Sequence, residues 1–291
     1  MNIKYSTLKQ YGCEKPVRQK YTKQGVPCGK CLTCIKKKRG QWFLRLGHEL
    51  HYSTSAYFVT LTYAEKCLPR VRGKPTLSKK DFNKFLKNVR KQQDNLTDKH
   101  NAEKQKIRYY GCGEYGDTFD RPHYHILLFN TLPDVITHLD KSWNYGAVHI
   151  GDITPARMMY TTKYMMKGSL YKDGRERAFV RMSTGRQKPS GIGGEWLKRN
   201  AEIIKENEML TIRNINGDLQ FLPRYYREYI WKDEDERKYV IQKHMKLFKE
   251  STQKENERLK KYYKNLEDWH WSTVSDLKRK KLKQLKKVSI L

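Results

Sequence analysis

The spacing of hydrophobic residues predicts three β-strands in the middle of the chain. Aromatic and β-branched residues fill positions 57–63, and apolar residues dominate positions 123–129. A further strand is predicted over residues 107–112, and the Gly- and Asp-rich stretch 113–120 joins it to the strand at 123–129. A turn-forming stretch between two strands predicts an antiparallel hairpin.

Helical spacing of apolar residues predicts helices around these strands. The first predicted helix carries an apolar stripe at Leu32, Ile35, Trp42, Phe43, Leu46 and Leu50. The second begins after Ser78, a candidate N-cap with Asp81 three residues further on. Its apolar stripe consists of Phe82, Phe85, Leu86 and Val89. A third helix is predicted over residues 157–167, after the start signal Thr154.

These elements divide the chain into three zones. Residues 1–55 form an N-terminal Cys-rich segment that leads into a helix, and residues 56–232 alternate strand-like and helix-like stretches. Residues 233–291 form a basic tail of high helix propensity that ends in a Lys-rich run at 278–287. The sequence shows no internal repeat. The middle zone holds most of the motifs that carry chemistry.

The chain carries a large excess of positive charge. Its 291 residues include 61 Lys and Arg against 31 Asp and Glu, a formal net charge of +30. This excess indicates a polyanionic partner, and nucleic acid is the commonest one. A membrane surface is the competing polyanion, but the sequence has no apolar run long enough to span a bilayer and no signal-peptide hydrophobic region. We therefore expect a cytosolic protein.

The motif His123-Tyr124-His125 lies in the last of the three predicted strands. Successive side chains of a strand point to opposite faces, so the two imidazoles share one face. Glu114 ends the preceding strand, and antiparallel pairing can bring its carboxylate beside them. Two nitrogens and one carboxylate suit Mg²⁺ or Mn²⁺ as well as Zn²⁺. The alternatives are a hydrogen-bonded His pair without metal and an ordinary turn acid at Glu114. Other nearby carboxylates are Asp117 and Asp120.

The third predicted helix carries Tyr160 and Tyr164 one turn apart. Their spacing projects both phenols from one face, while Lys163 and Lys167 form a second such pair. Two phenols one turn apart can address the same metal-held phosphate alternately, and Lys163 is a candidate cation for the phenolate or the phosphate. The alternatives are that both tyrosines pack on the sheet with their hydroxyls in solvent, and that Lys163 contacts DNA backbone only.

Three of the six cysteines, Cys28, Cys31 and Cys34, fall within seven residues. Such crowding indicates a reducing compartment, because a disulfide framework spreads its cysteines along the chain. With Cys13 as a fourth ligand, these thiolates could bind structural zinc. Buried free thiols and an iron–sulfur site are the alternatives, although the fuller spacing of iron–sulfur sites is missing.

The order of these motifs resembles that of the HUH endonucleases of rolling-circle replication. A T-x-T strand is followed by Glu114, by H-x-H and by Y-x-x-K-Y, and Tyr124 stands at the bulky position between the histidines. The two-tyrosine form is similar to that of microviruses. The stretches that resemble gokushovirus-type replication initiators are residues 28–34, 58–63, 113–116, 121–125, 191–194 and 223–226. The resemblance covers roughly residues 13–230.

This resemblance implies an α+β, ferredoxin-like fold, with an antiparallel sheet of about five strands and helices mainly on one face. The metal site would lie on the exposed face of the sheet, where Glu114, His123 and His125 bind Mg²⁺ or Mn²⁺ that polarises a scissile phosphate. Tyr160 or Tyr164 would attack, leaving a 5′-phosphotyrosine and a free 3′-hydroxyl. The second tyrosine would cut the regenerated origin, and the freed 3′-hydroxyl would close a circle.

The implied partners are single-stranded DNA, the replication origin, and the helicase and DNA polymerase of a bacterial host, in whose cytoplasm the protein would act. Arg121 and Lys167 are expected to contact DNA. The sequence contains no P-loop, so unwinding is expected to come from the host. Two other functions fit some of the motifs: a non-catalytic nucleic-acid-binding or packaging protein, and an HUH transposase or relaxase. The ordered set of Glu, H-x-H and Y-x-x-K-Y favours an enzyme, because binding alone does not require it.

Overall fold

The computed structural model describes residues 13, 15–18, 25–99, 105–163, 173–185 and 189–260. The chain divides into two compact units, Met1–Ile230 and Trp231–Leu291. The first unit contains a central sheet and the stretches that carry the family resemblance. Each unit is described by itself below.

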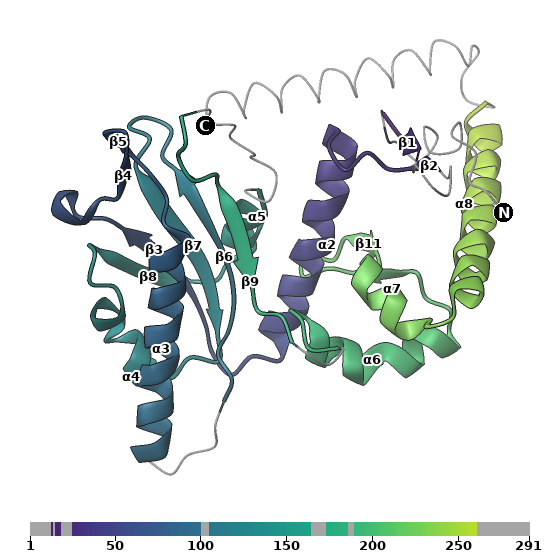
Figure 1. The fold of residues 1–291 in the computed structure, drawn as a ribbon. Helices are drawn as coiled ribbons and strands as arrows, with labels where there is room; N and C mark the ends of the chain where they lie inside the picture. Colours follow the sequence, from purple (N-terminus) through teal and green to yellow (C-terminus); the bar gives the residue numbers. More distant parts are fainter. Residues whose placement is uncertain are drawn as a thin grey trace. The chain divides into compact units, whose positions relative to one another are not determined.

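A five-stranded antiparallel sheet forms the centre of the first unit (Figure 1). In spatial order its strands are β8 (Val148–Asp152), β3 (Ala56–Thr62), β7 (Pro122–Phe129), β6 (Arg108–Tyr115) and β9 (Phe179–Met182). Strand β7 lies between β3 and β6 and is antiparallel to both, which is the split arrangement of ferredoxin-like folds. The predicted α+β class and the antiparallel sheet are therefore confirmed. The predicted hairpin is β6–β7, although β6 extends to Tyr115, so the turn is shorter than the stretch 113–120.

One face of the sheet packs against helix α3 (Lys79–Lys99), the short helix α4 (Pro133–Ile136) and the 3-10 helix η2 (Leu139–Ser142). The strand residues of this core are Val59, Leu61, Tyr124, Ile126 and Leu128. Helix α3 begins where the sequence predicts, because Ser78 Oγ accepts a hydrogen bond from the Asp81 N–H at 3.1 Å. The Tyr124 hydroxyl accepts a hydrogen bond from the Ser78 N–H at 2.9 Å, so a core side chain of β7 also fixes the start of α3.

Two helices pack on the opposite face of the sheet. Helix α2 (Leu32–His51) contributes Phe43 and Leu46, and helix α5 (Pro155–Lys163) contributes Met158, to a core cluster with Leu127 and Phe129 of β7. Helices therefore cover both faces, which corrects the expectation that they lie mainly on one face. The reason is that this second face is also largely apolar and must be covered to be stable.

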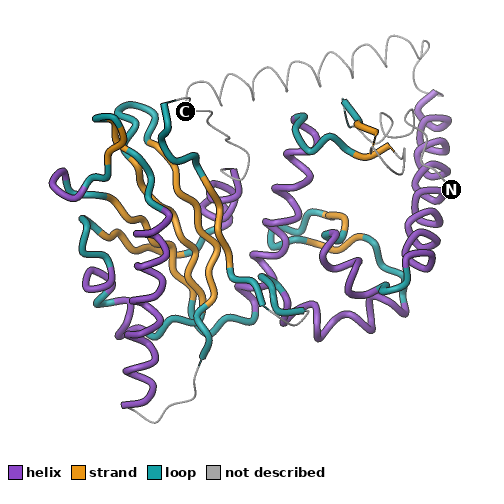
Figure 2. The backbone as a smooth tube through the Cα atoms, in the orientation of Figure 1, coloured by secondary structure: helices purple, strands orange, loops and turns teal. Residues whose placement is uncertain are grey.

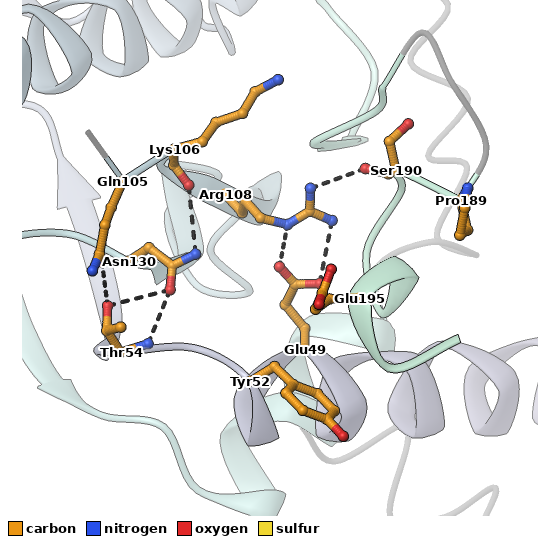
Figure 3. A pocket seen from close by; sticks show the side chains of 10 residues that line it. All are labelled: Glu49, Tyr52, Thr54, Gln105, Lys106, Arg108, Asn130, Pro189, Ser190 and Glu195. Carbon is orange, nitrogen blue, oxygen red and sulfur yellow. Dashed lines mark hydrogen bonds and ion pairs between the residues drawn. The ribbon is translucent and has the colours of Figure 1, made fainter. Parts of the chain in front are cut away.

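A buried ion pair connects α2 to β6 and to the segment before α6. Glu49, which is 5% exposed, pairs with the Arg108 guanidinium, whose Nη1 also donates to the Ser190 carbonyl oxygen at 2.9 Å. Glu49 Oε2 accepts a further hydrogen bond from the Gly193 N–H at 2.6 Å. These groups lie beside an open cavity of about 450 Å³ (Figure 3). Because each buried charge has a partner and hydrogen bonds, the cost of burying it is offset.

Outside the main sheet, the described residues form three two-stranded ribbons (Figure 2). The ribbons pair β1 (Val17–Arg18) with β2 (Gly25–Val26), β4 (Arg70–Val71) with β5 (Lys74–Pro75), and β10 (Thr211–Arg213) with β11 (Leu219–Phe221). The remaining helical elements of this unit are η1 (Glu65–Cys67), α6 (Gly194–Glu206) and α7 (Arg224–Ile230).

In its described part, the second unit contains the single helix α8 (Glu234–Lys260). Asp233 caps it, because its Oδ1 accepts hydrogen bonds from the N–H groups of Asp235 at 3.0 Å and Glu236 at 2.7 Å. The helix predicted for the tail is thus observed as far as Lys260, and the Lys-rich run at 278–287 lies outside the described residues. None of the described helices is both long and apolar enough to cross a membrane.

Replacing Phe82 by Ala should lower the free energy of unfolding by about 3–5 kcal/mol. The Phe82 side chain is fully buried between α3 and the sheet, so truncation removes apolar contacts and leaves a cavity. Urea denaturation followed by circular dichroism measures the effect. Lys80→Ala, at a position of the same helix outside the core, is the matched control and should change stability by less than about 0.5 kcal/mol. Equal unfolding midpoints for Phe82→Ala and the unaltered protein would contradict this assignment of the core.

Candidate metal and nucleophile site

Glu114, His123 and His125 meet on one face of the β6–β7 hairpin. Glu114 is the direct partner of His123 in the strand register, and His125 follows two residues later on the same face. Glu114 Oε1 lies 3.1 Å from His123 Nε2 and 3.0 Å from His125 Nε2. Glu114 is 3% exposed and His125 is 8% exposed. The structure thus brings together the three groups nominated from the sequence, but on a covered face of the sheet rather than an exposed one.

The other ring nitrogen of each histidine has its own partner. His123 Nδ1 lies 3.1 Å from the Arg121 carbonyl oxygen, which can only accept a hydrogen bond, so Nδ1 carries a proton. His125 Nδ1 lies 3.0 Å from Thr60 Oγ1. Partners of this kind fix the orientation of a ligating ring and leave Nε2 free for a metal.

The ligand set fits a divalent cation. The donor atoms of Glu114, His123 and His125 all lie within 4.8 Å of one another. His125 Nε2 is buried without a hydrogen bond, and a buried polar atom in that state requires an explanation. A cation bound between the two Nε2 atoms and the carboxylate would satisfy it.

Burial and charge act in opposite directions on these groups. Burial opposes the ionisation of Glu114, but hydrogen bonding and attraction to His123 and His125 outweigh it and lower the pKa of Glu114. Burial also opposes the positive charge on His123, but the Glu114 carboxylate outweighs it and raises the pKa of His123. The site is therefore built to hold positive charge beside Glu114, and a metal ion would take the place of the imidazolium proton.

Helix α5 brings Tyr160 to the same carboxylate. The Tyr160 hydroxyl donates to Glu114 Oε1 at 3.0 Å, and its ring packs edge-on against His125 with centroids 5.2 Å apart. Tyr160 remains 39% exposed, so a phosphate in solvent can reach it. The alternative in which this hydroxyl only faces solvent is therefore wrong.

Two contacts position α5. Thr154 Oγ1 accepts a hydrogen bond from the Arg157 N–H at 3.2 Å, as the start signal predicts. Arg39 of α2 donates to the Met159 carbonyl oxygen at 3.2 Å, next to Tyr160. The position of the phenol thus depends on α2 as well as on its own helix.

The remaining nominated residues lie around this centre or outside the described part. Lys163 is half-buried and ends α5, whereas Tyr164 and Lys167 lie outside the described residues. Arg121 is 42% exposed; it pairs with Glu65 at 2.5 Å and donates to the Tyr63 carbonyl oxygen at 2.7 Å. The carboxylates that converge with the imidazoles do not include Asp117 or Asp120 among the described residues.

The role of Thr60 was missed by sequence reasoning. Thr60 faces His125 directly in the β3–β7 register, and Phe58 of the same strand stacks on the His125 ring with centroids 5.4 Å apart. The T-x-T strand was visible in the sequence as part of the family pattern. Only the pairing of β3 with β7, between residues 65 positions apart, shows that its first threonine holds an imidazole.

A second group of potential ligands lies at the start of α2. The Sγ atoms of Cys13, Cys28, Cys31 and Cys34 lie within 4.8 Å of one another, and all four cysteines are free. Hydrogen bonds from the backbone N–H groups of Lys30 and Cys31 lower the pKa of Cys28, whereas burial raises the pKa of Cys34 to about 12.

The stretches 191–194 and 223–226 pack against each other and support the fold. The Gly191 N–H donates to the Tyr225 hydroxyl at 3.1 Å, and the Tyr226 hydroxyl donates to the Gly193 carbonyl oxygen at 3.1 Å. Gly193 has a φ of +74°, and a Cβ there would lie 2.2 Å from the Tyr226 hydroxyl, so only glycine fits. These two stretches therefore contribute to structure away from the ligand cluster.

Comparison with known proteins agrees with this arrangement of motifs. Residues 56–169 match the model of a protein family described as replication-associated protein ORF2. The matched segment includes β3, the β6–β7 hairpin and α5, and therefore Glu114, His123, His125 and Tyr160.

Several phage proteins are similar over most of the chain. Replication-associated protein VP4 of Bdellovibrio phage phiMH2K is 25% identical over 238 residues, covering 77% of this chain and 73% of the relative. Replication-associated protein ORF2 of Spiroplasma virus 4 is 29% identical over 245 residues, covering 77% of this chain and 74% of the relative. Replication-associated protein ORF4 of Chlamydia phage 1 is 22% identical over 71% of this chain and 54% of the relative.

Among solved structures, the N-terminal nuclease domain of minute virus of mice non-structural protein 1, described with Zn²⁺ coordinated in its active-site pocket, covers 58% of this chain and 82% of its own. Its sequence identity is 8% and its TM-score 0.20, so nothing further is drawn from this likeness. The family model and the phage relatives together support the assignment of the chain to the replication-associated proteins. Within that class, they support a replication initiator of the microvirus type.

Replacing Thr60 by Val should weaken Mn²⁺ binding by about 10- to 100-fold, because the His125 ring loses the partner that orients it. Isothermal titration calorimetry of the full chain with Mn²⁺ measures the affinity. Thr62→Val is the matched control, since the Thr62 hydroxyl contacts the Ala147 carbonyl oxygen at 3.4 Å instead of an imidazole. Equal Mn²⁺ affinities for Thr60→Val and Thr62→Val would contradict this role of Thr60.

Proposed function

We propose that this chain initiates rolling-circle replication of a single-stranded DNA phage by nicking origin DNA with a tyrosine at a metal site. The observation that carries the proposal is the hydrogen bond of 3.0 Å from the Tyr160 hydroxyl to Glu114 Oε1. It joins a candidate nucleophile to a carboxylate that two imidazoles also approach. The formal net charge of +30 supports DNA as the substrate.

Glu114, His123 and His125 would hold the divalent cation. One carboxylate and two nitrogens leave open positions for phosphate oxygens, and this donor set suits Mg²⁺ or Mn²⁺. When bound, the cation polarises the scissile phosphate and stabilises the negative charge of the pentavalent transition state. Thr60 and the Arg121 carbonyl oxygen hold the two imidazoles in position for it.

Tyr160 would attack the scissile phosphorus through its hydroxyl oxygen. The new bond from the tyrosine oxygen to phosphorus forms as the bond to the 3′ oxygen of the preceding nucleotide breaks. The phenol loses its proton and the departing oxygen gains one, which leaves a 5′-phosphotyrosine and a free 3′-hydroxyl. Lys163, four residues before the end of the predicted helix at 167, would stabilise the phenolate or the phosphate as a cation.

Tyr164 would supply the second nucleophile, one predicted helical turn after Tyr160. It would cut the regenerated origin after one round of synthesis, and the released 3′-hydroxyl would then attack the first phosphotyrosine link. Each exchange conserves one phosphodiester bond, so circularisation needs no nucleotide hydrolysis. Two tyrosines on one helix therefore suit strand transfer as well as nicking.

The proposed partners follow from this reaction. The protein would bind single-stranded DNA at the origin, with Arg121 and Lys167 contacting the backbone. A helicase and a DNA polymerase of the bacterial host would unwind and extend the strand in the host cytoplasm.

The double variant Tyr160→Phe/Tyr164→Phe should form no covalent adduct with a labelled single-stranded origin oligonucleotide in Mn²⁺. Phenylalanine keeps the ring packing but has no hydroxyl to attack, so DNA binding should persist. Tyr160→Phe alone should slow the first cleavage at least about tenfold. Denaturing gels measure the adduct, and fluorescence anisotropy measures binding.

Tyr109→Phe, which alters a half-buried tyrosine on the α3 face of the sheet, is the matched control and should nick like the unaltered protein. Adduct formation by the double variant at the unaltered rate would exclude both tyrosines as nucleophiles. If the unaltered protein binds the origin strand but forms no adduct with or without Mn²⁺, a non-catalytic binding or packaging protein becomes the better description.

A further inference from the structure

Four cysteines converge at the start of α2, away from the nicking site. Cys34 lies in the first turn of α2, Cys28 and Cys31 lie in the loop before it, and Cys13 comes from a separate segment. Cys13 is 4% exposed and Cys34 is 8% exposed. The Cys28 and Cys34 sulfurs are 4.0 Å apart. A tetrahedral site with Zn–S bonds of about 2.3 Å places its sulfurs about 3.8 Å apart, so the cluster is close to that geometry.

The backbone around the cluster is arranged to stabilise negative charge on sulfur. Cys28 Sγ accepts hydrogen bonds from the N–H groups of Lys30 at 3.4 Å and Cys31 at 3.2 Å. Cys13 Sγ accepts a hydrogen bond from the Cys28 N–H at 3.3 Å. Gly29, with a φ of +70°, allows the loop to turn so that these N–H groups face the sulfur atoms. Hydrogen bonds to an ionised acceptor are stronger than those to a neutral one, which favours thiolates here.

We propose that Cys13, Cys28, Cys31 and Cys34 bind one structural Zn²⁺ that fastens the segment around Cys13 to the start of α2. Four sulfur ligands leave no open position, which is the pattern of a structural site. A disulfide would require a sulfur pair about 2.05 Å apart, and all four cysteines are free. Zinc here would act separately from the Glu114 site, since the two clusters share no residue.

The expected consequence is local stiffening of the helix that supports the nicking site. The same helix carries Arg39, which holds the Met159 carbonyl oxygen beside Tyr160, and Phe43, which packs on the sheet. Fixing its first turn would therefore steady both contacts. The exposed lysines Lys36, Lys37 and Lys38 follow the cluster directly, so zinc would also hold a basic strip in place.

Metal analysis of the purified full chain tests this site. Mass spectrometry of acid-digested protein should find about one zinc per chain after dialysis, and Cys31→Ser should lose it. Cys67→Ser, which alters a cysteine outside the cluster, should keep it, as should Glu114→Gln. Zinc content unchanged by Cys31→Ser, or absent from the unaltered folded protein, would overturn the proposal. Iron with visible sulfur-to-iron absorption would also overturn it, in favour of an iron–sulfur cluster.

Cobalt substitution covers the case in which Cys31→Ser does not fold. Co²⁺ in a four-thiolate tetrahedral site gives strong near-ultraviolet thiolate absorption together with visible bands. The unaltered protein loaded with Co²⁺ should show both, and Zn²⁺ should displace them. Their absence from folded, reduced protein would exclude four-thiolate binding.

A different observation concerns the turn of the β6–β7 hairpin, which presents an exposed aromatic ring beside the candidate metal site. Phe119 is 76% exposed, although exposure of a large apolar ring costs free energy. The turn that holds it is braced, because the Gly116 N–H donates to the Arg121 carbonyl oxygen at 2.9 Å and Asp120 pairs with Arg175 at 3.1 Å. Phe119 is four residues from His123, so their Cα atoms are at most about 15 Å apart.

We infer that Phe119 stacks on an unpaired base of the strand held at the metal site, an inference that rests on the proposed function. A braced loop can hold a flat ring at a fixed distance from the scissile phosphate, and aromatic rings bind unpaired bases of any sequence by stacking. The neighbouring Arg121 guanidinium is 42% exposed and can contact the backbone of the same strand.

Phe119→Ala should weaken binding of single-stranded origin DNA by about tenfold, and Phe119→Trp should restore it. Fluorescence quenching of 2-aminopurine placed near the nick should also be lost in Phe119→Ala. Phe221→Ala, at an exposed aromatic on β11, is the matched control. Unchanged affinity and quenching in Phe119→Ala, with Tyr160→Phe still slow to nick, would overturn the stacking role alone. Absence of nicking by the unaltered protein would instead count against the proposed function.

Discussion

The register between β6 and β7 is the constraint on which the candidate site depends. It sets Glu114 opposite His123 and leaves His125 on the same face two residues further on. A slip of one residue would move every side chain of a strand to the other face and separate the carboxylate from both imidazoles. The register of β3 against β7 adds the next layer, because it sets Thr60 opposite His125. Strand pairing alone therefore assembles both the ligands and one group that orients them.

The same alternation that makes the ligand face also makes the core. Tyr124, between the two histidines, is fully buried on the α3 face, and its hydroxyl is 2.9 Å from that of Tyr63. The Tyr63 hydroxyl in turn donates to Asp81 of α3 at 2.9 Å. The bulky residue of the H-x-H motif thus locks β7 against β3 and α3. Rigidity of the core on one face holds the spacing of the ligands on the other.

The nucleophile reaches the site by a less direct route. Tyr160 belongs to a helix outside the sheet, and Met158, Thr154 and the α2 residue Arg39 set its position. Helix α2 is itself held through the buried Glu49 carboxylate, which contacts Arg108 of β6 and the Gly193 N–H. The glycine-rich stretch that marks the family resemblance is therefore tied to the helix that supports the phenol, without approaching the metal ligands.

The sequence alone determined the features set by neighbouring residues. Alternation predicted β3 and the β6–β7 hairpin, Ser78 and Thr154 predicted two helix starts, and the motif order predicted the α+β class and the replication-initiator family. Contacts between distant segments needed the tertiary structure. The Thr60 contact with His125, the Glu49–Gly193 contact across 144 positions and the covering of the ligand face by α2 are of this kind. Local sterics and period act within a few residues and are written in the sequence pattern, whereas these contacts arise only when packing brings separate elements together.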